Sequence, residues 1–262
     1  MYVGIDIGGT NIRIASSEAT TNPQIIERVN FLNSINYADN MHRIVEAINK
    51  LAFNNVEGIG IGIPGRLNKD NTSITHSRTI TQWIDKPIVE TLKDEFRCPV
   101  KMNGDPYCAA LSETLVAQSK KDFYFIIYGT GIGAARVSYT NGKPDILKFS
   151  DEEHAEYLHP WQKDCGGRWI AQKYDKPASE LSDAEWPIIM ERFYVHFLYF
   201  MEKQRSQRVI FSGGIAVKQW PRLEEVFHKF KSEHLEYKDV VIGLAHYGED
   251  AGLYGAFGLL DV

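Results

Sequence analysis

Hydrophobic residues along the 262-residue chain follow a strand period in some segments and a helical period in others. In segment 11–17, Ile12 and Ile14 alternate with polar neighbours, which is the period of two of a half-buried strand. Segment 41–51 carries its apolar residues at helical spacing and predicts an amphipathic helix. The same theme of hairpin strands followed by alternating strands and helices begins again near residue 123. Two α/β domains are therefore expected, with a cleft between them.

The individual elements follow from the same pattern and from the turn residues between them. Strands are predicted at 2–7, 11–17, 24–31, 56–63, 99–102, 123–128, 132–139 and 208–212, and helices at 41–51, 88–96, 107–118, 186–203 and from Pro221 onward. Asn141-Gly142 predicts a tight hairpin turn. The alternating glycines of segment 56–63 indicate close approach of another backbone or of a ligand. The domain boundary is expected near residue 103.

Composition and charge exclude several classes of protein. Hydrophobic residues make up 44% and charged residues 24%, which is typical of a globular chain. A net charge of -5 disfavours a nucleic-acid partner. The segment 188–201 is apolar but is interrupted by Glu191, Arg192 and His196, so we expect a buried helix and no membrane association. No signal-peptide pattern is visible, and three widely separated cysteines fit a reducing cytoplasm.

Three glycine clusters directly follow predicted strands, at Gly8–Thr10, Gly129–Gly133 and Ser212–Gly214. Glycine lets a backbone turn tightly and lets its N–H groups approach a phosphate without a side chain in between. Each cluster alone also fits an ordinary turn. The residues after Gly133 resemble a strand and a hairpin, so the helix that a dinucleotide-binding motif requires is not predicted. Recurrence at three strand ends favours a nucleotide cleft and a phosphoryl-transfer enzyme.

Acidic residues stand at three further informative places. Asp6 lies inside an apolar strand, where an unpaired carboxylate is unfavourable, and a bound Mg²⁺ with its water shell would explain it. Asp105 precedes Pro106 at the start of a predicted helix, where it can be a structural N-cap, a group that accepts a proton from a hydroxyl, or both. The run Asp151–His154 fits either a solvated turn or a polar binding surface.

Taken together, these residues resemble the ROK family (repressors, open reading frames and sugar kinases) of the actin-like ATPase superfamily. The resemblance runs from end to end of the chain. It is carried in order by the opening phosphate motif at Met1–Arg13, the sugar-side loop at Gly60–Gly65, the catalytic stretch Asp105–Glu113, the second phosphate motif at Gly129–Gly133, the adenosine motif at Phe211–Ile215 and the C-terminal helix that includes Asp250–Ala256.

The resemblance implies two actin-like ATPase (ribonuclease H-like) domains with a nucleotide and sugar cleft between them. The smaller would comprise residues 1–103 with a C-terminal helix at about 247–262, and the larger residues 104–246. It also implies the cofactors ATP and Mg²⁺, with Asp105 as general base or orienter for the attacking hydroxyl and Asp6 holding Mg²⁺ through water. The implied nucleotide-binding residues are Asp6, Gly8, Gly9, Thr10, Asn11, Arg13, Gly129, Thr130, Gly131, Gly133, Ser212, Gly213 and Gly214. The implied sugar-binding residues are Gly65, Asn103, Asp105, Asp151, Glu152, Glu153 and His154.

Several positions depart from the family pattern. Gly104 stands where most members have Asn directly before the catalytic Asp, and Tyr107 replaces a second common Asn. Asp151 replaces the Glu that usually stands three residues before the motif histidine. The family's zinc-binding cysteine cluster is reduced to Cys165. Because His154, His159 and Cys165 fall short of four ligands, no zinc site is expected.

The resulting hypothesis is a glucokinase-like enzyme that phosphorylates a hexose or N-acetylhexosamine with ATP, at the 6-hydroxyl. Its expected partners are small molecules, and the expected form is a cytoplasmic homodimer. Two alternatives remain open: a non-catalytic sugar or nucleotide sensor of the same fold, and an ATPase that phosphorylates no sugar. Family repressors carry an N-terminal DNA-binding domain, whereas this chain begins with the phosphate motif, so a repressor is not expected.

Overall fold

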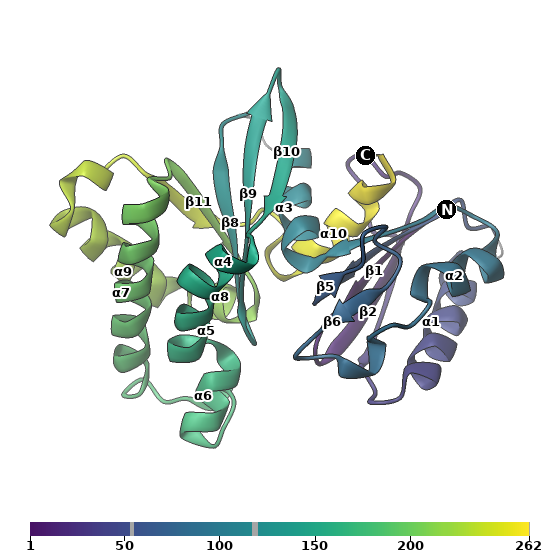
Figure 1. The fold of residues 1–262 in the computed structure, drawn as a ribbon, viewed down its shortest axis with the longest axis horizontal. Helices are drawn as coiled ribbons and strands as arrows, with labels where there is room; N and C mark the ends of the chain where they lie inside the picture. The colour runs from purple at the N-terminus through teal and green to yellow at the C-terminus, as the bar shows by residue number, and fades with distance from the viewer. Residues whose placement is uncertain (53–54, 117–119, 262) are drawn as a thin grey trace. The chain divides into compact units, whose positions relative to one another are not determined.

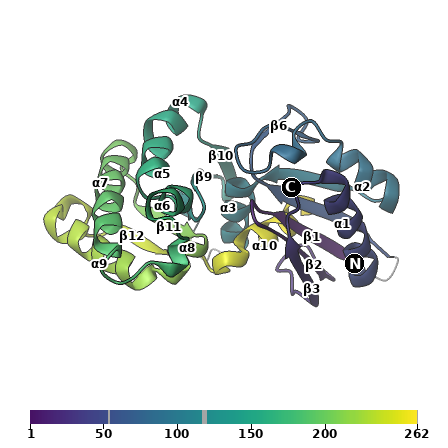
Figure 2. The same ribbon diagram turned by 90° about the horizontal axis from the view of Figure 1, so that it is seen from below.

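A computed structural model describes residues 1–52, 55–116 and 120–261. The chain forms two compact units, one of Met1–Ala117 with Asp250–Val262 and one of Gln118–Glu249. Figure 1 and Figure 2 show that each unit contains a sheet with helices packed around it.

The first unit is built on a five-stranded sheet in the order β3-β2-β1-β4-β7. Strands β1 to β3 pair antiparallel, whereas β4 and β7 run parallel to β1. These strands are β1 (Tyr2–Ile7), β2 (Asn11–Ser17), β3 (Glu27–Leu32), β4 (Gly58–Ile63) and β7 (Val100–Gly104), and a small hairpin joins β5 (Arg66–Leu67) to β6 (Ile74–His76). The helices are α1 (Tyr37–Ala52), α2 (Ile88–Phe96), α3 (Asp105–Val116) and α10 (Ala251–Gly258), with 3₁₀ turns at Thr81–Trp83, Gly248–Asp250 and Leu259–Asp261.

The two faces of this sheet are covered in different ways. On one face, Ile59, Ile61 and Ile63 of β4 pack in an apolar core with the buried side of α1. On the other face stand the glycines that alternate with them. A Cβ atom built on Gly60 would lie 1.7 Å from the backbone oxygen of Ala256 in α10. The glycine pattern of β4 therefore allows a helix backbone to lie directly against the sheet.

Helices α3 and α10 approach each other equally closely. A Cβ atom built on Gly255 would lie 1.6 Å from the backbone oxygen of Cys108 in α3. Figure 1 shows α10, in yellow, beside α3 and β1. This contact explains why α3 belongs to the first unit, although the sequence analysis assigned residues 104–116 to the larger domain. The compact units therefore divide at residues 117 and 118, beyond the boundary expected near residue 103.

The second unit also contains a five-stranded sheet, in the order β10-β9-β8-β11-β12. Its strands are β8 (Phe123–Tyr128), β9 (Ile132–Thr140), β10 (Lys143–Lys148), β11 (Arg208–Ser212) and β12 (Val241–Leu244). Its helices are α4 (Asp151–Glu153), the π-helix η2 (His154–Leu158), α5 (His159–Cys165), α6 (Gly167–Tyr174), α7 (Trp186–Gln204), α8 (Gly214–Lys218) and α9 (Trp220–Glu233), with 3₁₀ turns at Ala178–Glu180 and Leu235–Tyr237.

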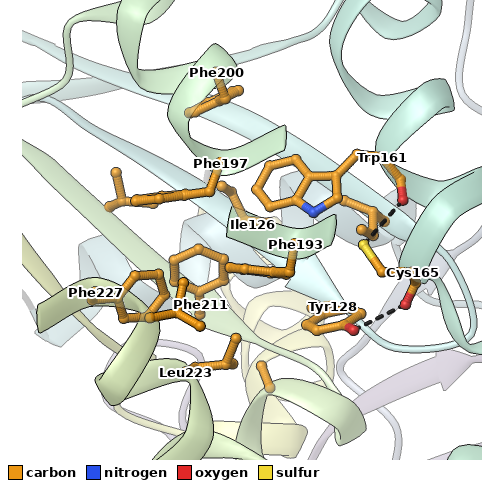
Figure 3. Close-up of a cluster of buried hydrophobic side chains, with 14 of the residues drawn as sticks. Ile126, Tyr128, Trp161, Cys165, Phe193, Phe197, Phe200, Phe211, Leu223 and Phe227 are labelled. Atoms are coloured by element: carbon orange, nitrogen blue, oxygen red, sulfur yellow. Dashed lines mark hydrogen bonds between the residues drawn. The ribbon is translucent and has the colours of Figure 1, made fainter. Parts of the chain in front are cut away.

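An aromatic cluster fills the space between this second sheet and its helices (Figure 3). Phe197 of α7 is fully buried, with ring centroids 5.0 Å from Phe227 and 5.1 Å from Phe230 of α9. Phe193 stacks on Tyr128 of β8 at 5.2 Å, and Trp161 of α5 lies 5.1 Å from Phe193. These rings join α5, α7, α9 and β8 into one core.

Most predicted strands and helices are confirmed, and β1, β2, α2, β8 and β11 have the predicted bounds. The Asn141-Gly142 turn is confirmed by φ angles of 52° and 75°, as a two-residue hairpin requires. Strand β3 begins at Glu27, not at residue 24. Strands β10 and β12 and the helical run 151–174 were not predicted. The last residues of the predicted helix 107–118 lie outside the described residues.

Candidate active site

The first glycine loop connects β1 to β2 as a tight turn. The Gly8 N–H donates to the Asn11 carbonyl over 2.8 Å, and the Asn33 side chain donates to the Gly8 carbonyl over 2.7 Å. Gly9 and Thr10 are nevertheless exposed at the tip. The loop is thus both a structural turn and an accessible surface, and the two interpretations of this cluster are compatible.

Asp6 lies near the end of β1 and faces the start of α10. Its side chain is 17% exposed, and its Oδ2 lies 3.8 Å from Nη1 of Arg13. A Cβ atom built on Gly252 would lie 3.1 Å from Oδ1, so a larger residue there would crowd this carboxylate. Burial raises the pKa of Asp6 to about 6, the positive charge of Arg13 opposes the shift, and the nearby Asp250 adds to it.

Asp250 is a member of this cluster that sequence reasoning did not assign to the site. Its Oδ1 lies 3.7 Å from Nη1 of Arg13, and its Oδ2 lies 3.2 Å from Nη1 of Arg28. The motif Asp250–Ala256 was noticed as a helix, but only the fold places its first residue beside Arg13. Arg13 therefore lies between two carboxylates and is shared by them.

The carboxylates near Arg13 suit a magnesium ion that is held mainly by water molecules and by substrate oxygens, with few protein ligands. Mg²⁺ typically binds one or two carboxylates, keeps several waters and takes further oxygens from substrate phosphates. Asp6 supplies one largely buried carboxylate, and the second carboxylate nearby, that of Asp250, is paired with Arg13. Over the described parts of the chain, no group of three or more His, Cys, Asp or Glu side chains is placed to hold a metal ion. The residues present thus fit a water-mediated Mg²⁺ and not a closed protein cage.

The ends of the parallel strands bring the other first-unit candidates to the same edge of the sheet. Asp6 of β1 pairs with Gly62 of β4, and Gly62 pairs with Asn103 of β7. Two strand spacings of about 4.8 Å separate the backbones of Asp6 and Asn103. Asp105 begins α3 directly after this row, half-buried in the first helical turn, where the helix dipole favours its charged form.

Gly65 follows the same strand ends and requires its glycine. Its φ is +130°, and a Cβ atom there would lie 2.6 Å from the backbone oxygen of His76. Asn103 turns its amide oxygen back to accept the Gly104 N–H over 2.9 Å. Asn103 and Tyr107, which replaces a common Asn of the family, together line a cavity of about 270 Å³ that also contacts Thr72.

In the second unit, the other two glycine clusters also lie side by side. Strands β8 and β11 are parallel, and Ile127 pairs with Ser212, so the loop after β8 and the loop after β11 leave the sheet at one end. Gly213 has a φ of +96°, and a Cβ atom there would lie 2.6 Å from the Tyr128 carbonyl oxygen. Ser212 is buried, and its hydroxyl donates to the Gly248 carbonyl over 2.6 Å. Ser212 therefore fixes the loop, while Gly214 begins α8.

The acidic run at 151–154 begins a helix, so the solvated-turn interpretation is wrong. Ser150 caps this helix: its hydroxyl accepts the Glu153 N–H over 3.2 Å, and the Glu153 carboxylate accepts the Ser150 N–H over 2.8 Å. Glu153 is thus turned back onto its own helix. Asp151 and Glu152 are exposed in the first turn, and His154 begins the π-helix η2. A π-helical segment is frequent at functional sites.

The residues near Cys165 do not fit a zinc site. Cys165 is fully buried, its thiol donates to the Trp161 carbonyl over 3.2 Å, and burial raises the pKa of the thiol well above its ordinary value. Zinc takes about four ligands, and Cys165 is the only cysteine in segment 151–174. Instead, Asp164 of α5 binds His196 of α7 at 2.7 Å and lies 3.5 Å from Arg192. An ion pair and the aromatic cluster join the two helices here.

Two other features of the described residues bear on the function. A larger cavity, of about 730 Å³, lies between α7 and α9, and none of the predicted site residues lines it. In the described parts of the chain, no helix is both long and apolar enough to cross a bilayer.

Comparison with known proteins identifies the family. A sequence profile of the ROK family matches residues 2–145. An N-acetyl-D-glucosamine kinase of Histophilus somni (strain 129Pt) is 33% identical over 99% of this chain and 98% of its own length. A fructokinase of Zymomonas mobilis is 25% identical over 68% of this chain and 67% of its own.

A solved structure has the same fold. The ROK family glucokinase from Streptomyces griseus, in complex with glucose and AMPPNP, superimposes with a TM-score of 0.76 and 18% identity, covering 98% of each chain. The resemblance first indicated by the glycine clusters and acidic residues is thereby confirmed, together with the actin-like ATPase fold. The chain belongs to the ROK family.

Proposed function

We propose that this protein is an ATP-dependent kinase that phosphorylates a hydroxyl group of a hexose or N-acetylhexosamine, glucokinase-like, at the 6-hydroxyl. The observation that carries the proposal is the row of Asp6, Gly62 and Asn103 across three parallel strands, with Asp105 at its end. Asp6 and Asp105 thus lie at the same edge of the sheet, which supports a role beside Mg²⁺ for the first carboxylate and a role toward a hydroxyl for the second.

Each group then has a distinct role. Asp105 accepts the proton of the attacking sugar hydroxyl or orients that hydroxyl, and its place in the first turn of α3 is one where the helix dipole favours a negative charge. Asp6 orients waters around Mg²⁺, and the ion when bound neutralises charge on the β- and γ-phosphates. Backbone N–H groups of the loops at Gly8–Thr10 and Gly129–Gly133 bind phosphate oxygens. Chemistry of this kind depends on positioning and charge stabilisation rather than on covalent intermediates.

The substrate class rests on the relatives and on polar groups of the two units. Similar proteins include an N-acetyl-D-glucosamine kinase, a fructokinase and a glucokinase, whose names indicate hexoses or an N-acetylhexosamine as substrates. Sugars are bound by planar polar groups, which Asn103, Asp151, Glu152 and His154 supply. We assign Glu153 to the helix cap rather than to direct sugar contact. The homodimer and the cytoplasmic location remain predictions.

A coupled ADP-release assay tests the proposal. The purified protein is given Mg-ATP with and without glucose, mannose, fructose, allose, N-acetylglucosamine or N-acetylmannosamine, and the phosphorylated position is read by NMR. We expect ADP release that depends on at least one of these sugars. ADP release at the same rate without sugar would identify an ATPase, and nucleotide binding without turnover would identify a sensor. Light scattering of the same sample measures the molar mass and so tests the predicted homodimer.

A further inference from the structure

The loop at Gly129–Gly133 is held from one side by the segment Gln162–Arg168, which we call the buttress. The Gly167 N–H donates to the Gly129 carbonyl over 2.9 Å, and the Arg168 N–H donates to the Thr130 carbonyl over 2.8 Å. The side-chain oxygen of Gln162, which lies in α5, accepts the Ile132 N–H over 3.2 Å. Three successive parts of the loop are therefore bound to one segment about thirty residues later in the chain.

These bonds also determine where the loop's own donors point. In a planar trans peptide the C=O and the following N–H point in opposite directions. Since the carbonyls of Gly129 and Thr130 are turned toward the buttress, the N–H groups of Thr130 and Gly131 are turned away from it. Backbone N–H groups aligned in this way form an anion-binding surface. The buttress thus selects the loop conformation that presents two donors outward.

Close packing makes this arrangement specific. A Cβ atom built on Gly131 would lie 2.6 Å from the Gln162 side-chain oxygen, and one built on Gly167 would lie 2.8 Å from the Gly129 carbonyl oxygen. Gly167 is therefore required by contact with the backbone of the loop, whereas a side chain at Gly131 would have to displace the end of the Gln162 side chain. The inward side of Gly131 is occupied by Gln162, and only its other side is left for a ligand.

The buttress is itself anchored to the core of the second unit. Tyr128, the last residue of β8, donates its hydroxyl to the Cys165 carbonyl over 2.9 Å (Figure 3). Asp164 binds His196 of α7, and Trp161 is fully buried in the aromatic cluster. The same helical run begins at Asp151, so it extends from the proposed sugar-binding residues to the phosphate loop.

We propose that Gln162 is a positioning residue for nucleotide binding, which acts by fixing the Gly129–Gly133 loop with its N–H groups outward. The inference rests on the proposed kinase function, because it assumes that this loop binds the phosphates of ATP. Gln162 does not touch the nucleotide in this proposal. It determines the orientation of the groups that do.

The test compares Gln162→Ala with the wild type in two measurements. Calorimetry gives the Kd for AMPPNP, and steady-state kinetics give the KM values for ATP and for the sugar. One lost hydrogen bond corresponds to about a 2- to 12-fold weakening. We expect both the Kd for AMPPNP and the KM for ATP to rise in this range, with the sugar KM unchanged. Gln172→Ala, at an exposed position of α6, is the matched control and should leave all three unchanged.

A second variant separates positioning from folding. Gln162→Met keeps the side-chain volume but lacks the acceptor, so it should reproduce the nucleotide defect with a normal circular dichroism spectrum. Gly131→Ala adds a coupling test: its effect on the Kd should be large in the wild type and small in the Gln162→Ala background, where the side chain that it would displace is gone.

The outcomes distinguish this inference from the proposed function. Sugar-dependent turnover by the wild type, with unchanged nucleotide affinity in both Gln162 variants, would overturn the inference and leave the function standing. An equal rise in the KM values for ATP and sugar would show a general structural role and would also overturn it. A wild type that binds no AMPPNP would overturn the function, and this inference with it.

Discussion

Replacement of Asp6 by Asn should stabilise the metal-free protein near neutral pH. The carboxylate is largely buried, its pKa is raised to about 6 mainly by that burial, and Arg13 compensates only in part. Because the folded state holds this proton more tightly than the unfolded chain does, the protonated form favours folding. The contribution of protonated Asp6 to the free energy of unfolding of the wild type is fully present below the ordinary pKa of 3.8. This contribution is lost as the pH rises through about 6.

The magnitude follows from the same shift. A rise from 3.8 to about 6 corresponds to about 3 kcal/mol, at about 1.4 kcal/mol per pKa unit. This figure already includes the attraction to Arg13 and the repulsion from Asp250, since both contribute to the shift. Asn has nearly the shape of the protonated acid and cannot ionise. The stability difference between Asp6→Asn and the wild type should therefore grow by about 2.4 kcal/mol between pH 4 and pH 7.5, since at pH 4 more than half of the unfolded chains are already ionised at this residue.

Urea unfolding at a series of pH values, without nucleotide or metal, measures this difference. Hydrogen exchange of amides in β1 and β4 should be the probe, because it reports the first unit alone. Asp94→Asn, at an 81% exposed position of the same unit, is the control and should show no such trend. A difference that changes by less than about 0.5 kcal/mol over this range would refute the assignment of a raised pKa. If Asp6 also serves Mg²⁺, the stabilised variant should lose activity, a common trade-off at functional sites.

Three further predictions concern the site and the core. Asp105→Asn should lower sugar phosphorylation by about 10²- to 10⁴-fold with ATP affinity nearly unchanged, as loss of a general base does. Activity within a few-fold of the wild type, with only about 0.5–2 kcal/mol of lost stability, would instead show a helix-capping role. Elemental analysis of protein purified without chelator should find no stoichiometric zinc, because His154, His159 and Cys165 fall short of four ligands; one zinc per chain would contradict this. Phe197→Ala should destabilise the second unit by about 3–5 kcal/mol in urea unfolding, since the ring is fully buried among Phe227, Phe230 and their neighbours. A loss below about 1 kcal/mol would show that the cluster closes around the gap.

The sequence alone determined the local structure and much of the candidate site. An apolar run predicted β1 and period-two alternation predicted β2, both with their observed bounds, and the positive φ angles at Asn141 and Gly142 follow from residue type. Asp6 was recognisable because a carboxylate within an apolar strand needs an explanation. One local signal was overlooked: Ser150 and Glu153 form a capping box, which is a sequence signature for the helix that begins there.

Tertiary structure decided the remaining features, because they depend on contacts between residues far apart in the chain. Helix α3 belongs to the first unit since Gly255 lets α10 lie against Cys108, and no local pattern encodes that pairing. Asp250 lies beside Arg13 only once the C-terminal helix has folded onto β1. Gln162 likewise meets Gly131 because α5 is fixed by a core of rings from α7 and α9. Periodicity shows which face of an element is buried, but the partner against that face is selected by packing of the whole unit.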